Sequence, residues 1–385
     1  LLKAIQYSYM KKGPQNDDSE DSVAFVLFNV KGKDLLAIDQ VNDFFDERNP
    51  EQARNETFAK YEQLGLSAEP FKNVHYYYPY SLPKTRHWNT YMTPEEVADN
   101  IKKKKAKKYK YIYKYDKDNL DLMFANIDYS TQTMESIISY IMSGQGKFNQ
   151  IRDWQEFLEA VKEKCSAETS GKDKEIPVAS WRKFYRIINK SITDNKIFAR
   201  DIREDDGETR IGDALKYIKK NEVHVIDIAK LSEDKQAYVF GDAVRTIYDL
   251  QLGQYAGEEG VNPPSRVVIF IDELNKYASK ETPKNSPILR QVLDVAERGR
   301  SLGVILFAAE QFRSAIHDRV TGNCSTHAYG RTNSIEVAKG DYKSIPSVYK
   351  TMMTRLKQGE YIIQNPVFRS LLNIKFPKPI YKQFK

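Results

Sequence analysis

Cysteine and histidine, which often build covalent or metal sites, are scarce in this sequence. Only two cysteines are present, Cys165 and Cys324, and they lie far apart without metal-ligand spacing around them. Such sparse cysteine use is typical of a reducing compartment, so we expect a cytoplasmic protein. No Ser/His/Asp or Cys/His arrangement stands out, and the histidines lack metal-ligand spacing as well. We interpret four of them as structural: His75, His224, His317 and His327.

Long hydrophobic runs are also missing. No apolar run approaches the roughly 20 residues that a membrane-spanning helix needs, and no signal peptide opens the sequence, so we expect no membrane partner. The 385 residues, 41% hydrophobic and 29% charged, suit a globular protein with one large domain or two smaller ones. The net charge of +7 permits a nucleic-acid partner without requiring one.

A phosphate-binding loop of the form G-x-x-x-x-G-K-[ST] is absent from residues 1–385. The nearest candidate is Gly144-Gln-Gly-Lys147. Ile141 occupies the position of its first glycine and Phe148 that of its closing Ser or Thr. We therefore do not interpret this segment as a nucleotide site.

The chain is organised around residues 266–277, RVVIFIDELNKY. Five apolar residues run directly into Asp272 and Glu273, and such a run predicts a strand buried on both faces of a parallel sheet. Ligands of these sheets bind at the carboxyl ends of the strands. Asp272 there would hold Mg²⁺, usually through water, and Glu273 would orient or activate the attacking water. The alternative is that both acids end the strand and face solvent.

Alternation of strands and helices around this segment predicts an α/β fold with a mostly parallel sheet of six or seven strands flanked by helices. Residues 267–271, a helix over 287–301 and a strand over 303–309 form a complete βαβ unit, for which a right-handed crossover is expected. The other predicted strands are 23–30, 74–79, 223–228, 327–331 and 360–364.

Residues 81–220 differ from the rest and are predicted to be a mainly helical insertion between two parts of the core, 1–80 and 221–385. Its segment 101–118 holds nine lysines, two aspartates and four tyrosines, and alternation within it predicts an edge strand or hairpin arm. Lysines with aromatic neighbours can neutralise phosphates and stack on bases. The alternative is a solvated edge that lysines protect from aggregation. The candidate nucleic-acid ligands are Lys103, Lys105, Lys108 and Lys110.

Five segments, taken in order and spacing, carry a family resemblance. They resemble the HerA/FtsK group of P-loop ATPases, and HerA-type ATPases above all. In that group they correspond to the strand after the phosphate-loop helix, the Walker B strand, a basic helix-to-strand connection, a strand ending in a polar sensor Gln, and a short strand with an Arg. In this sequence they are Phe28–Asp34, Val267–Glu273, Ala296–Val304, Phe307–Gln311 and Asn323–Arg331.

The resemblance implies a RecA/FtsK-like P-loop fold and an ATP hydrolase that uses ATP and Mg²⁺. Asp272 would support the ion, Glu273 would position the water, and Gln311 would sense the γ-phosphate or bond that water. Arginines that offset phosphoryl charge are implied as well. The candidates are Arg298, Arg300 and Arg331. Arg331 is slightly favoured, and roles within the chain or towards a neighbouring subunit stay open; the alternative for the first two is capping of a helix C-terminus.

The missing phosphate loop is expected just upstream of Leu1, because in this group it precedes a helix and then a strand like 23–30. Residues 1–10 have the pattern of the middle of a helix, which favours truncation over a degenerate fold that lost the loop. Asn29 and Lys33 depart from the group, which commonly has an acid and a Glu at these positions.

The function implied by the resemblance is a ring, expected to be a hexamer, that translocates or unwinds double-stranded DNA. Such a helicase-like motor would work with a nuclease or other effector in DNA processing or antiviral defence against phage. Three alternatives remain open: a non-hydrolysing scaffold with the ATPase fold, a secretion ATPase of the same group that moves protein, and a nucleotide-dependent regulator without translocation.

Overall fold

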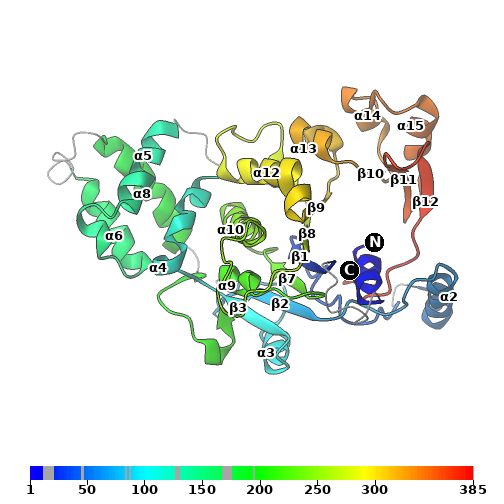
Figure 1. The fold of residues 1–385 in the computed structure, drawn as a ribbon, viewed down its shortest axis with the longest axis horizontal. Helices are drawn as coiled ribbons and strands as arrows, with labels where there is room; N and C mark the ends of the chain where they lie inside the picture. The colour runs from blue at the N-terminus through cyan, green and yellow to red at the C-terminus, as the bar shows by residue number, and fades with distance from the viewer. Residues whose placement is uncertain are drawn as a thin grey trace.

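The computed structural model describes residues 1–385 except 12–20, 45–46, 83–84, 86–87, 126–130, 167–175, 194–195 and 385. At its centre is a seven-stranded sheet of order β6-β3-β2-β7-β1-β8-β9, in which every pairing is parallel (Figure 1). The expected α/β fold, a mostly parallel sheet flanked by helices, is confirmed. The strands are β1 (Val23–Asn29), β2 (Val74–Pro79), β3 (Ala106–Tyr109), β6 (Glu208–Thr209), β7 (Val223–Asp227), β8 (Arg266–Asp272) and β9 (Val304–Ala309).

Helices cover both faces of this sheet, which explains why β1 and β7 are buried along their whole length. Alternate residues of β1 point to opposite faces, so Val26 and Phe28 pack in one core while Phe25 and Leu27 pack in the other. The first face is covered by α9 (Ile211–Lys216), α10 (Glu233–Gln251) and α12 (Pro287–Leu302). The second is covered by α1 (Leu2–Lys11) and α3 (Pro94–Lys102).

A helical module lies beyond the β3–β6 side of the sheet, on the left of Figure 1. An aromatic core that includes Trp154, Phe157, Trp181 and Phe184 fills it. The flanking strands β3 and β6 belong to the main sheet, so the range 81–220 is shared between sheet and module. The module and its borders contain β4 (Tyr111–Ile112), α4 (Tyr113–Asp116), η1 (Lys117–Phe124), α5 (Thr131–Met142), η2 (Gly146–Asn149), α6 (Trp154–Lys164), α8 (Val178–Thr193), β5 (Phe198–Ala199) and η3 (Glu204–Asp206).

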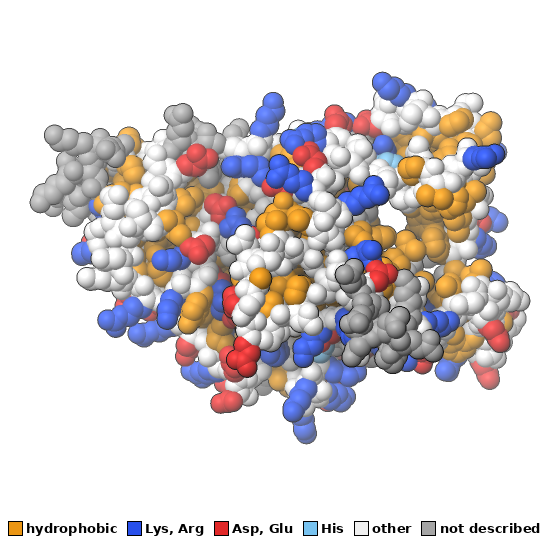
Figure 2. Space-filling model, in the orientation of Figure 1, with side chains coloured by type: hydrophobic (Ala, Val, Ile, Leu, Met, Phe, Trp, Pro, Cys, Tyr) orange, Lys and Arg blue, Asp and Glu red, His pale blue; other side chains and the backbone are white. Residues whose placement is uncertain are grey.

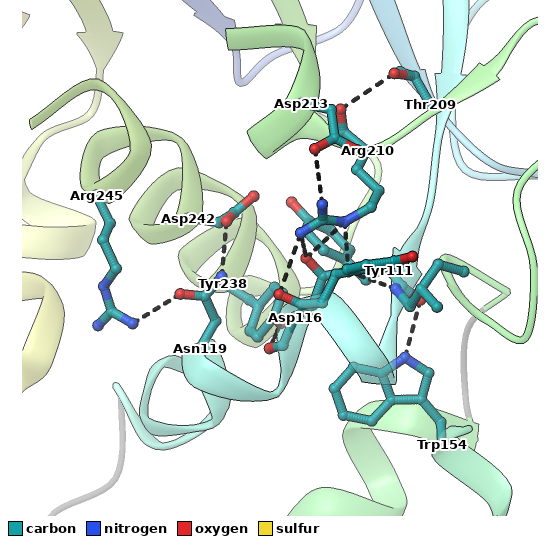
Figure 3. Close-up of polar contacts among 12 residues, drawn as sticks. Tyr111, Asp116, Asn119, Trp154, Thr209, Arg210, Asp213, Tyr238, Asp242 and Arg245 are labelled. Carbon is teal, nitrogen blue, oxygen red and sulfur yellow. Dashed lines mark hydrogen bonds and ion pairs between the residues drawn. The ribbon is translucent and has the colours of Figure 1, made fainter. Parts of the chain in front are cut away.

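Buried polar contacts fasten this module to α9 and α10, as Figure 3 shows. Arg210 Nη2 lies 2.6 Å from Asp116 Oδ1, and Asn119 Nδ2 donates to Asp242 Oδ1 at 2.7 Å. Arg245 Nη1 donates to Asn119 Oδ1 at 2.7 Å. Because each pair joins segments about a hundred or more residues apart, these contacts fix the module against the sheet rather than leave it on a flexible linker.

The lysine- and tyrosine-rich segment is divided between β3, β4 and α4, so the single edge strand or hairpin arm expected from its alternation is wrong. β3 is an inner strand of the main sheet, whereas β4 pairs only with β5 in a two-stranded sheet. β3 pairs with β2 on one side and β6 on the other. Tyr109, Tyr111 and Tyr113 are buried in the core, and Lys110 is buried between the first two.

The C-terminal part forms a second, antiparallel sheet on the right of Figure 1. The predicted strands 327–331 and 360–364 therefore lie outside the parallel sheet. Exposed hydrophobic side chains, Ile335, Val348, Val367 and Phe368, belong to this part, and Figure 2 shows hydrophobic side chains gathered there. Its elements are β10 (His327–Tyr329), α14 (Ser334–Val337), η5 (Gly340–Tyr342), α15 (Ser347–Met353), β11 (Glu360–Gln364) and β12 (Leu372–Lys375).

The remaining described elements are the helix α2 (Pro50–Gln63), the short helices α11 (Asn275–Ala278) and α13 (Asp318–Asn323), and the 3-10 turn η4 (Arg313–Ala315). After β12 the chain returns to the main core, where Tyr381 bridges to Val41. In the described parts of the chain, no helix combines the length and apolarity needed to cross a membrane.

Candidate functional site

Two adjacent carboxylates lie where β8 ends, at the carboxyl edge of the parallel sheet. Glu273 follows the last strand residue and has φ of 57°, a left-handed conformation that is uncommon for a residue other than glycine. Its backbone N–H donates to Asp272 Oδ1 at 2.9 Å, which stabilises the turn. Unusual backbone conformations of this kind gather at functional sites, because the surrounding structure must hold them in place.

Two lysines neutralise this acidic pair. Lys31, in the loop after β1, has its Nζ 2.6 Å from Glu273 Oε1 and 3.6 Å from Asp272 Oδ2. Lys276 Nζ lies 2.8 Å from Glu273 Oε2. Hydrogen bonds from Lys276 and then Lys31 lower the pKa of Glu273, so this carboxylate is ionised at neutral pH. Lys31 reaches Glu273 because β1 and β8 are adjacent strands of the sheet.

A third acid lies close to these charges. Burial raises the pKa of Asp34, and the neighbouring Asp272 raises it further while Lys31 lowers it. Carboxylate oxygens at the end of a parallel strand are the hard ligands that Mg²⁺ takes, so Asp272 and its neighbours fit a magnesium ion. Lys31 holds part of the positive charge that such an ion would otherwise supply.

The end of β9 lies beside this turn. Asp272 pairs in register with Ala309, and Leu274 N donates to Ala309 O. The Glu310 carboxylate accepts from Asn275 N at 2.9 Å and from Gln311 N at 2.7 Å, so it ties the two strand ends together. Gln311 is exposed at the same edge of the sheet. The sequence had indicated Gln311 here but had missed the positioning role of Glu310.

The three candidate arginines are not gathered at the acids. Arg298 and Arg300 are exposed near the C-terminus of α12, and Arg331 is exposed just after β10 in the antiparallel sheet. Within the described residues, none of them forms an ion pair with Asp272 or Glu273. Their phosphate-facing roles therefore remain predictions.

One of the candidate nucleic-acid lysines is sequestered. Lys110 Nζ lies 2.6 Å from Glu208 Oε2, with side-chain exposures of 5% and 4%, and 3.9 Å from the centroid of the Tyr80 ring. An ammonium buried in this way cannot reach a phosphate, so the expectation that Lys110 contacts DNA is wrong. The expectation failed because the acidic partner of Lys110, Glu208, lies on β6, far away in the sequence.

The other three lysines remain at or near the surface. Lys103 pairs with Asp99 one helical turn away, and Lys105 pairs with Asp39. Lys108 is partly exposed beside Tyr80. Surface ion pairs of this kind are weak and can be exchanged for a phosphate, so a nucleic-acid role for these three stays a prediction.

Asn29 and Lys33, which depart from the family pattern, have structural partners. Asn29 Nδ2 donates to Asp227 Oδ1 at 2.9 Å and to Gly32 O, and its Oδ1 accepts from Leu35 N. It therefore holds the loop that carries Lys31. Lys33 Nζ lies 2.9 Å from Glu96 Oε2 at the start of α3.

Asp227 is buried, and its titration should affect stability. Burial raises its pKa to about 6, although hydrogen bonds from Thr90 and Asn29 oppose the shift. Because the folded state keeps this proton to a higher pH than the unfolded chain does, the group's contribution to stability falls as pH rises through about 6. Asp227→Asn should therefore gain about 1–2 kcal/mol relative to wild type between pH 5 and pH 8. Urea unfolding at both pH values measures this, and a difference that does not change with pH would contradict it.

The fold and site together define a class: an α/β protein whose doubly covered parallel sheet presents acidic residues at its carboxyl edge, where such sheets bind ligands. No protein-family model matches the sequence, and no curated protein matches it.

Solved structures with a similar chain path include two of a coupling protein and one of a viral NTPase. The bacterial conjugative coupling protein TrwBdeltaN70 has 11% identity over 96% of this chain and 88% of its own, with a TM-score of 0.47. Plasmid coupling protein TrwB in complex with ADP and Mg²⁺ has 12% identity over 100% of this chain and 85% of its own, with a TM-score of 0.41. Genome packaging NTPase B204 from Sulfolobus turreted icosahedral virus 2 has 16% identity over 43% of this chain and 71% of its own, with a TM-score of 0.30.

Proposed function

We propose that this chain contains the nucleotide-hydrolysing core of an ATP-driven motor that acts on double-stranded DNA. The observation that carries the proposal is the pair Asp272 and Glu273 at the carboxyl end of β8, inside a parallel sheet and held by Lys31 and Lys276. Phosphoryl transfer needs mainly positioning and electrostatic stabilisation, and these groups supply both.

Each residue has a role in this proposal. Asp272 supports Mg²⁺, which offsets charge on the phosphates when it is bound. The ionised Glu273 orients the attacking water and accepts its proton. Lys31, which contacts both carboxylates, would share the neutralisation of Asp272 with the bound ion, and Gln311 would contact the γ-phosphate from the end of β9.

The edge strand β9 offers a place for the phosphate-binding loop. No strand in the described part of the chain pairs with its outer edge, although the strand is apolar, and Leu306 and Phe307 are only partly buried. An unpaired apolar edge is a template for a further strand. We propose that a strand carrying the phosphate loop pairs there, because its carboxyl end would then bring the loop beside Gln311 and Asp272.

The finer assignment is a HerA-type translocase or helicase in a cytoplasmic ring, expected to be a hexamer. It rests on the motif resemblance, and so does a nuclease or effector partner in DNA processing or antiviral defence. Two features support assembly. The C-terminal part exposes apolar side chains, which commonly mark interfaces. The exposed Arg298, Arg300 and Arg331 are free to act on a neighbouring subunit's nucleotide.

A second candidate function is a non-hydrolysing scaffold, favoured by the absence of a phosphate loop within residues 1–385. ATP hydrolysis by the full-length protein with Mg²⁺, measured with and without double-stranded DNA, separates the two. We expect hydrolysis that DNA stimulates. If the assembled protein does not hydrolyse ATP, the scaffold function is favoured. If the hydrolysis rate is the same with and without DNA, a protein-moving ATPase or a regulator is favoured.

A further inference from the structure

Two histidines and a glutamate meet at the amino-terminal ends of β2 and β7, the end of the sheet opposite Asp272. His75 and His224 face one another in the parallel register of these strands, with ring centroids 5.3 Å apart. Glu222 directly precedes β7. The proposed ATPase mechanism does not use this cluster. The cluster could not be recognised from the sequence, because the two histidines are 149 positions apart.

The spacing of the side chains suits a metal ion. Glu222 Oε2 lies 3.0 Å from His224 Nε2, and Glu222 Oε1 lies 3.6 Å from His75 Nε2. One ligand atom from each of the three residues lies within 4.8 Å of the others. Bonds of about 2.0–2.2 Å in a tetrahedral zinc site hold ligand atoms roughly 3.3 Å apart. The pair Glu222 Oε2 and His224 Nε2 is already near this value, and rotation of the Glu222 and His75 side chains would bring His75 Nε2 to the same ion.

The surroundings hold the ligands in place and leave an entrance. The side-chain exposure is 4% for His224, 20% for Glu222 and 38% for His75, so an ion could enter past His75. Tyr77 stacks on the His224 ring at 5.3 Å, and Lys219 N donates to Glu222 Oε2 at 2.9 Å. Such outer contacts orient metal ligands.

We propose that His75, Glu222 and His224 bind a divalent transition-metal ion, with zinc as the expected occupant. Two imidazole nitrogens and one carboxylate oxygen form a three-ligand zinc set that water completes. Mg²⁺ and Ca²⁺ prefer oxygen ligands throughout, so this site differs from the magnesium site at Asp272. Lys107, on β3 in register with Tyr77, places a positive charge nearby and moderates the affinity.

Zinc here would strengthen one end of the sheet. It would join β2 to β7 beside the backbone that anchors α1, where Gln6 Nε2 donates to Lys72 O and Asn221 O. The ion is therefore expected to stabilise the fold and not to take part in hydrolysis.

The test is zinc binding by the tag-free full-length protein after a chelator has removed bound metal, read out by competition with a chromophoric chelator. We expect about one zinc per chain. His75→Ala and Glu222→Gln should each weaken binding at least about 100-fold. His317→Asn is the matched control, because it removes a histidine elsewhere and keeps the helix-capping acceptor.

A second readout separates binding from misfolding. Zinc should raise the Tm of the wild type but not that of His75→Ala, which alters a partly exposed side chain and should still fold. Equal zinc binding by wild type and both variants would overturn the proposal, as would no binding by the wild type. Binding lost only when Cys165 and Cys324 are replaced by serine would assign the metal to the thiols and overturn it equally.

Discussion

Glu273→Gln should lower the rate of ATP hydrolysis by about 10²–10⁴-fold and leave ATP binding largely intact, because the amide cannot accept the proton of the attacking water. In the wild type, Lys276 and Lys31 keep this carboxylate ionised and hold both of its oxygens. Glutamine fills the same volume beside the same lysines. The measurement is steady-state hydrolysis with Mg²⁺ at saturating ATP, with nucleotide binding followed separately by fluorescence.

The matched control is Glu281→Gln, the same chemical change at an exposed position eight residues further along the chain. It should hydrolyse ATP at the wild-type rate. If Glu273→Gln keeps full activity while the protein binds nucleotide, Glu273 is not the catalytic acid. Glu310, at the end of the neighbouring strand, then becomes the next residue to examine.

Lys110→Met should destabilise the fold by about 3–5 kcal/mol, because it leaves the carboxylate of Glu208 buried without a counter-charge. The pair is 2.6 Å apart and nearly excluded from solvent. The double variant Lys110→Met/Glu208→Gln should recover most of the loss, since the glutamine oxygen can still accept from Arg203 N, as Glu208 Oε2 does at 2.9 Å. Urea unfolding of the two single variants and the double variant measures the coupling.

Lys108→Met is the control on the same strand. Its ammonium is partly exposed, and no ion pair to it occurs among the described residues, so we expect a change within about 0.5 kcal/mol. A Lys110 variant as mild as this control would contradict the buried ion pair. The two variants also separate stability from DNA affinity, because only Lys108 is accessible to a phosphate.

The main strands could be predicted because their signal is local. Each of the segments 23–29, 74–79, 223–227 and 266–272 is a short run of apolar or aromatic residues, which suffices to indicate a buried strand. β3 was placed at an edge because its lysines resemble edge protection. Its true neighbour, β6, has only two residues and no pattern of its own, so nothing local could reveal the pairing.

The candidate site was predictable to a similar degree. Asp272 and Glu273 follow a strand directly, so their place at the carboxyl edge could be read from the chain. Lys31 could not be assigned, because its contact with Glu273 depends on β1 lying next to β8. The three arginines remain apart from the acids in this chain, and no sequence pattern states whether they act within it or across a subunit boundary.

By itself the sequence determined the alternation of strands and helices, the acidic end of β8 and the scarcity of cysteine, because these depend on residues that are neighbours in the chain. Only the tertiary structure decided which charges meet. The fold buries Lys110 against Glu208, brings Lys31 into an ion pair with Glu273, and places His75 beside His224 in the sheet register. Such pairs join segments tens to hundreds of residues apart, and strand order and register set them; a one-residue shift in register would turn each side chain to the other face of the sheet.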